Sequence, residues 1–153
     1  MRLSLKIFTI LFSALLFTSV HADMSYVTGL NNNIALQGAD PVAYFTDGKY
    51  LKGNSSFQIT YDGVTWQFTN SEHLELFKLN PQQFIPQYHG YSAYDMAQGK
   101  MTASLPNLWC IYQRKLYLNR SAKTHQAWLR NKGSFITGGD LNWKRMAATA
   151  SVQ

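Results

Sequence analysis

The first 22 residues are not expected to belong to the folded domain. Arg2 and Lys6 precede an apolar stretch at residues 7–17, and residues 20–22 (Val-His-Ala) have the character of a signal-peptidase site. Because this apolar stretch is too short to span a bilayer as a helix, the pattern predicts a cleaved secretory signal peptide. Removing residues 1–22 from the 153 leaves 131, which suffice for one domain with its own hydrophobic core.

The remaining chain carries a modest positive charge. The whole sequence has 14 Lys and Arg against 8 Asp and Glu, and the predicted signal peptide holds two of the basic residues and no acid, which leaves about +4. The basic residues are dispersed with no run longer than two, whereas a nucleic-acid-binding domain usually concentrates them on one face. We therefore expect no nucleic-acid partner and, after signal cleavage, no transmembrane segment.

Cys110 is the only cysteine, so no disulfide can form within the chain. It lies in the apolar run at residues 108–112, which predicts a buried and unreactive thiol, with a reactive or metal-binding thiol as the less favoured alternative. Packing alone must hold the fold together.

Two β-hairpins are predicted. Residues 57–61 and 64–68 alternate between apolar and polar side chains around Asp62-Gly63, a pair that suits a type I′ turn because both residues need positive φ. Residues 109–112 and 115–118 flank a polar turn and predict a second hairpin.

Helix signals follow each hairpin. Thr69 to Glu72 reads as a capping box for a helix to about residue 79, and Asn80-Pro81 begins a short second helix. Ser121 is expected to cap a helix to about residue 132, which Gly133 would end.

Two segments are less regular. Asp40-Pro41 predicts a turn that leads into an extended apolar segment at residues 42–45. Residues 86–99 form an aromatic loop in which residues 92–98 are expected to make one or two helical turns closed by Gly99.

The pattern as a whole predicts a small single α+β domain with two antiparallel β-hairpins, two main helices and an aromatic loop. We expect a flexible lead-in at residues 23–33, the domain at residues 34–146 and a frayed tail at residues 147–153.

Three histidines remain after signal cleavage: His73, His89 and His125. None has metal-ligand spacing to another, and taken singly each is more often a surface or core-edge residue. No nucleophile elbow or phosphate-binding glycine loop is present, so we do not expect an enzyme. The remaining catalytic alternative is a small hydrolytic enzyme that pairs Asp40 or Asp95 with His89.

The aromatic loop is the most unusual feature of the sequence. It contains tyrosines at every third position together with other polar and sulfur-containing residues: Tyr88, His89, Tyr91, Ser92, Tyr94 and Met96. Imidazole, phenol and thioether groups suit soft or borderline metals. The alternative is a tyrosine-rich segment that packs over the sheet with its hydroxyls in water.

These residues resemble the YHS-domain family in its longer exported form. The matching stretches lie in order along residues 35–143: 38–45, 61–68, Phe77-x-x-Asn80-Pro81, 86–94, 99–100, 115–119 and Trp128. The short form of this family occurs beside copper-transporting ATPases. The resemblance implies that the cysteines of this short form act as metal ligands.

The chain departs from that form at each cysteine position. Ala43 stands after Asp-Pro-Val, Thr69 and His73 stand at the two positions of the hairpin-to-helix junction, and Ser92 replaces the cysteine of the Gly-Tyr-Cys-Ala element. The resemblance therefore implies a domain that has lost its thiolate cage.

A weaker nitrogen, oxygen and sulfur site remains conceivable. His73 and His89, with Met96 or a tyrosine, could hold copper or zinc. The sequence and the resemblance together predict an exported YHS-like binding module, in the bacterial periplasm or secreted, that handles metal or meets an unknown envelope protein.

The alternative is a protein-interaction or scaffolding module with an aromatic surface and no metal. Its ligand or partner surface would include the following residues: Asp40, Tyr88, Tyr91, Ser92 and Tyr94. Two glycosylation sequons, at residues 54–56 and 119–121, have a role only in a host that glycosylates them.

Overall fold

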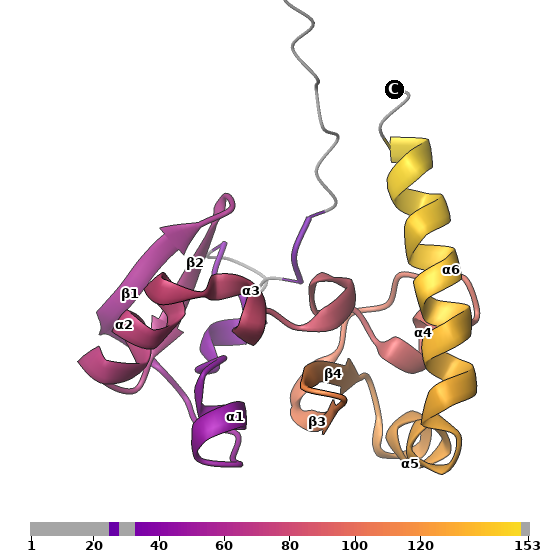
Figure 1. Ribbon diagram of the computed structural model, residues 1–153, viewed down its shortest axis with the longest axis horizontal. Coiled ribbons are helices and arrows are strands. Elements are labelled where there is room, and N and C mark those ends of the chain that lie inside the picture. The colour runs from indigo at the N-terminus through magenta and orange to yellow at the C-terminus, as the bar shows by residue number, and fades with distance from the viewer. Residues whose placement is uncertain (1–24, 28–32, 151–153) are drawn as a thin grey trace, which may run out of the picture.

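The computed structural model describes residues 25–27 and 33–150 (Figure 1). The signal peptide predicted for residues 1–22 lies outside the described residues, as do residues 28–32 and 151–153. Among the helices of the described part, none has the length and apolar character needed to cross a membrane.

The first predicted hairpin is confirmed. Strands β1 (Asn54–Tyr61) and β2 (Val64–Phe68) pair antiparallel around a turn in which Asp62 has φ 51° and Gly63 has φ 75°. Both central residues are left-handed, as a type I′ turn requires. β1 begins earlier than the alternation indicates and contains a bulge before Gln58.

The second predicted hairpin is also confirmed. Strands β3 (Leu105–Tyr112) and β4 (Lys115–Asn119) pair antiparallel, with Tyr112 opposite Lys115. Its turn residues Gln113 and Arg114 have φ of 49° and 62°, so this turn adopts left-handed backbone without glycine or asparagine.

The prediction of an extended segment at residues 42–45 is wrong. After the short 3₁₀ helix η1 (Leu36–Gly38), helix α1 (Ala43–Thr46) begins directly behind the Asp40-Pro41 turn. Asp40 Oδ1 accepts the N–H groups of Val42 and Ala43, which satisfies two donors at the start of the helix. Val42, Ala43 and Tyr44 are buried and Phe45 is half-buried, but on a helical turn.

Helix α2 (Ser71–Leu79) lies where predicted, although its cap was misassigned. Asn70 is the N-cap, and its Oδ1 accepts the N–H of His73 at 2.8 Å. Thr69 does not cap the helix because its hydroxyl donates to Asp40 Oδ2 instead. Helix α3 (Pro81–Phe84) begins with proline at its first position, as predicted.

The aromatic loop contains η2 (Gln87–Gly90) and α4 (Ala93–Ala97). Ser92 is the N-cap of α4, and Gly99 follows the helix with φ 73°. The helical turns predicted at residues 92–98 are therefore confirmed.

The C-terminal part differs from the prediction. Ser121 caps helix α5 (Ala122–Arg130) as expected, but Gly133 lies in the first turn of a further helix, α6 (Lys132–Ala150). The glycines of this segment obscure its helical pattern, whereas an apolar stripe that includes Phe135, Ile136 and Trp143 packs it onto the core. Residues 147–150 of the expected tail belong to this helix.

Two hydrophobic clusters make up the core. One gathers around Trp66, Phe68 and Phe77, and the other around Tyr117 and Trp128. Figure 1 shows β1, β2, α2 and α3 at one end, α4 to α6 at the other, and the β3–β4 hairpin between them. The α+β class predicted from the sequence is confirmed.

Gly139 is expected to be required for the packing of α6. A Cβ at this position would lie 2.6 Å from Tyr88 Oη and 2.9 Å from Tyr88 Cζ, and Tyr88 is buried. We expect Gly139→Ala to lower the free energy of unfolding by about 1–3 kcal/mol, because an overpacked core must shift side chains or backbone. Urea denaturation followed by circular dichroism measures this change.

Gly133→Ala is the matched control on the same helix. No heavy atom lies within 4 Å of a Cβ placed there. The control should therefore keep or raise stability, by up to about 1 kcal/mol, through helix propensity. Equal changes in both variants would contradict the packing role of Gly139.

Candidate metal centre at His73 and Asp47

Three positions singled out by the sequence resemblance, residues 43, 69 and 73, meet around one carboxylate. Asp40 is fully buried, and its Oδ1 accepts the N–H of Ala43 at 3.3 Å. Its Oδ2 accepts both the N–H and the hydroxyl of Thr69 at 2.8 Å and faces His73 Nδ1 at 2.7 Å. The structure therefore brings residues 43, 69 and 73 together through their hydrogen bonds to Asp40.

Local structure explains this convergence. Asp40 precedes α1, Thr69 directly follows β2, and His73 lies in the first turn of α2. The Asn70 cap fixes the start of α2, so the His73 side chain is directed back at the Asp40 carboxylate.

The contact with Asp40 orients the His73 ring. An ionised carboxylate can only accept hydrogen bonds, so Nδ1 is the donor in this contact. In the neutral imidazole, Nε2 then keeps its lone pair. A carboxylate on one ring nitrogen is the usual support of a histidine that binds metal through the other.

Two oxygen atoms of the kind that bind metal, from the end of α1, lie beside His73 Nε2. Thr46 Oγ1 is 3.2 Å and Asp47 Oδ2 is 3.6 Å from His73 Nε2, and the two oxygens are 3.4 Å apart. Donors bound at about 2.0–2.1 Å in a tetrahedral zinc site lie about 3.3–3.4 Å from one another. The three atoms therefore have the dimensions of one face of such a site.

The surroundings leave this face accessible. His73 is buried, whereas Thr46 and Asp47 are exposed. Within residues 25–27 and 33–150, no group of three or more His, Cys, Asp or Glu side chains is placed to hold a metal. The third donor here is a hydroxyl, which is a weaker ligand than a carboxylate, imidazole or thiolate.

His89 and Met96 have different surroundings from His73. His89 lies in η2 with φ 51°, where its ring stacks on Tyr26 at 4.0 Å and meets Trp143 at 4.9 Å. Met96 is fully buried in the cluster that contains Trp128. A shared site for His73, His89 and Met96 stays a prediction, and the contacts described above favour His73.

Much of the predicted partner surface is buried. Tyr88 donates its hydroxyl to Asp140 at 2.8 Å, and burial, followed by this hydrogen bond, raises the pKa of its phenol. Buried Ser92 donates to Asp95 Oδ2 at 2.6 Å, which also accepts from Arg120. With Asp40 also buried, only Tyr91 and Tyr94 of the predicted set are half-exposed.

Asp95 and Asp40 each form hydrogen bonds with partners other than His89, the residue with which the catalytic alternative pairs them.

Sequence reasoning missed Thr46 and Asp47, whose oxygen atoms lie beside His73. The Thr-Asp pair directly after the apolar segment was the available signal, but an extended segment would not have directed it at α2.

Comparison with known proteins supports the family resemblance. Residues 42–88 match the model of the YHS domain family, which confirms the resemblance predicted from the sequence. The matched stretch contains Thr46, Asp47, Thr69 and His73. No curated protein and no solved structure matches the chain.

Asp40→Asn is expected to destabilise the domain strongly. Oδ2 accepts the two Thr69 donors and contacts His73, and an amide can offer an oxygen at only one of the two carboxylate positions. Removing one partner from a buried charged network costs about 3 kcal/mol or more. The urea denaturation midpoint and its slope measure the loss.

Asp47→Asn serves as the control for that change. The Asp47 side chain is 40% exposed, so its substitution should alter the free energy of unfolding by less than about 1 kcal/mol. Similar losses in both variants would contradict the role assigned to the buried carboxylate.

Cys110 is expected to react slowly in the folded protein. Desolvation by burial raises the pKa of this half-buried thiol, which lowers the thiolate fraction near neutral pH. Alkylation by iodoacetamide at about pH 8 should therefore be slower than that of glutathione, and should accelerate as the pH rises further. Unfolding in urea should restore a normal rate, whereas a fast rate in the folded state would contradict the prediction.

Proposed function

We propose that this protein is an exported metal-binding module that holds Cu²⁺ or Zn²⁺ through His73 Nε2 and the Asp47 carboxylate. The Thr46 hydroxyl would contribute the third donor. One observation carries the proposal: these three atoms form a triangle with sides of 3.2, 3.4 and 3.6 Å, beside the carboxylate that orients the histidine. The YHS match and the N-terminal export pattern support it.

The donor types favour borderline divalent ions. Nitrogen and oxygen ligands suit Cu²⁺ and Zn²⁺, whereas Cu⁺ prefers thiolate and thioether sulfur. Cys110 lies in β3, outside the YHS match, and Met96 is buried in the other cluster. The proposed site therefore differs from a thiolate cage in the ion that it selects.

The small donor set implies a weak, exchangeable site. Two strong protein ligands and a hydroxyl leave further coordination positions to water, in contrast to the four protein ligands of a structural zinc site. A site of this kind suits a protein that takes up an ion and gives it to a partner. It would contribute little to folding, because Asp40 already satisfies the cluster without metal.

Metal titration of residues 23–153 tests the proposal. Isothermal titration with Cu²⁺ and Zn²⁺ should show one site per chain. His73→Gln should abolish that site, and Asp47→Asn should weaken it by about tenfold or more, because each removes a ligand. Circular dichroism and urea denaturation of each variant must show a folded domain.

Two controls separate this site from its alternatives. Glu75→Gln removes one exposed negative charge on α2 and should leave metal binding unchanged. His89→Gln should also leave it unchanged, whereas a loss there would favour the shared site of His73 and His89. Metal binding that survives both His73→Gln and Asp47→Asn would overturn the proposal, as would the absence of any binding.

A further inference from the structure

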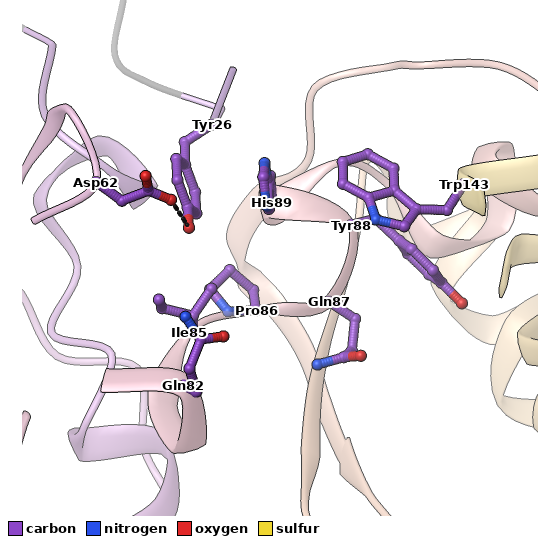
Figure 2. Close-up of a pocket in the computed structure, with 9 residues that line it drawn as sticks. All are labelled: Tyr26, Asp62, Gln82, Ile85, Pro86, Gln87, Tyr88, His89 and Trp143. Carbon is purple, nitrogen blue, oxygen red and sulfur yellow. Dashed lines mark hydrogen bonds between the residues drawn. The ribbon is translucent and has the colours of Figure 1, made fainter. Parts of the chain in front are cut away.

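A second candidate site is a pocket of about 260 Å³. It is formed where the β1–β2 turn, the end of α3, η2 and α6 meet. Figure 2 shows Asp62 and Tyr26 on one side, Trp143 on the other and His89 between the two rings. No residue of this pocket belongs to the donor set of His73, Thr46 and Asp47.

The pocket has negative charge in a positively charged protein. Asp62 is one of its lining residues, and no Lys or Arg side chain lines it, although the chain carries a net charge of +6. The side chains of Gln82 and Gln87 add amide oxygens that can accept hydrogen bonds. This combination of acceptors with one carboxylate complements a cation with N–H donors.

Aromatic rings add a second attraction for a cation. The ring of Tyr26 stacks on His89 at 4.0 Å with an interplanar angle of 15°, and Trp143 meets His89 at 4.9 Å with an angle of 71°. His89 covers one face of the Tyr26 ring, and Tyr26 is buried, so the half-buried Trp143 is the ring that can attract an ammonium group.

The pocket is also built before any ligand arrives. Tyr88 and His89 both adopt left-handed backbone, with φ of 56° and 51°, a conformation that costs side-chain-bearing residues free energy and concentrates at functional sites. The Tyr26 hydroxyl donates to Asp62 Oδ2 at 2.8 Å, which fixes the carboxylate beside the ring. Preorganisation of this kind lowers the entropy cost of binding.

We propose that this pocket binds a small organic ammonium ion, with its N–H groups on the Asp62 carboxylate and its carbon skeleton against the half-buried rings of His89 and Trp143. The site is independent of the metal site proposed above. Either could exist without the other, so the test is made in the presence of EDTA.

Three ligands of one shape test the charge requirement: benzylammonium, benzyl alcohol and benzoate. Titration of ¹⁵N-labelled residues 23–153, followed by NMR, should show shifts centred on Asp62, His89 and the Trp143 indole. Benzylammonium should bind about tenfold or more tightly than benzyl alcohol, because a charge-assisted hydrogen bond is replaced by a neutral one, and benzoate should bind least.

Asp62→Asn is the decisive variant. Asparagine tolerates the left-handed backbone of this turn and still accepts from Tyr26, so the variant should fold, as amide dispersion and circular dichroism will show. It should weaken benzylammonium about tenfold and leave benzyl alcohol unchanged. Glu75→Gln, which removes the same charge on α2, should affect neither ligand.

Three outcomes would overturn this proposal. Benzylammonium and benzyl alcohol could bind equally, which would show a pocket without charge selectivity. The shifts could map away from His89 and Trp143, or no ligand could bind at all. None of these results changes the metal titration, so the two proposals fail separately.

Discussion

The buried Asp40 carboxylate joins three segments of the chain. It is fully buried, and an isolated carboxylate in such a place would cost several kcal/mol. Its partners come from three segments: the first turn of α1, the end of β2 at Thr69, and His73 in α2. Because each segment supplies donors to the buried charge, the carboxylate ties the β1–β2 hairpin, α1 and α2 to one another. That same arrangement brings Thr46 and Asp47 to His73 Nε2.

Strand β4 lies between the two hydrophobic clusters of the core. Successive side chains of a strand point to opposite faces, so Leu116 and Leu118 join the cluster of Trp66 while Tyr117 joins that of Trp128. The segment from Ile85 to His89 crosses from the first cluster to the second. The pocket opens along this crossing, which explains why it is lined by the β1–β2 turn at one end and by α6 at the other.

Local patterns predicted local structure well and long-range pairing poorly. Asp62-Gly63 specifies its turn through backbone conformation alone, so the hairpin could be predicted. Thr69 satisfies the pattern of a helix cap, yet its hydroxyl binds Asp40, 29 residues away, and nothing in the adjacent sequence indicates that choice. Helix α6 was missed because its glycines lower helix propensity, whereas Gly139 is present to let Tyr88 approach. Asp40 and His73 were each singled out from the sequence, but only the fold pairs them.

The absence of thiols at positions 43, 69 and 73 has a chemical consequence. In an oxidising compartment, neighbouring thiols form disulfides or higher oxides and cease to bind metal. The side chains of Ala43, Thr69 and His73 contain no thiol, so they do not form disulfides or sulfur oxides. The buried carboxylate satisfies the cluster without metal, and only the outer nitrogen of His73 faces the exposed donors. Because the cluster is satisfied without an ion, release of a metal bound at His73, as proposed above, would leave the fold intact.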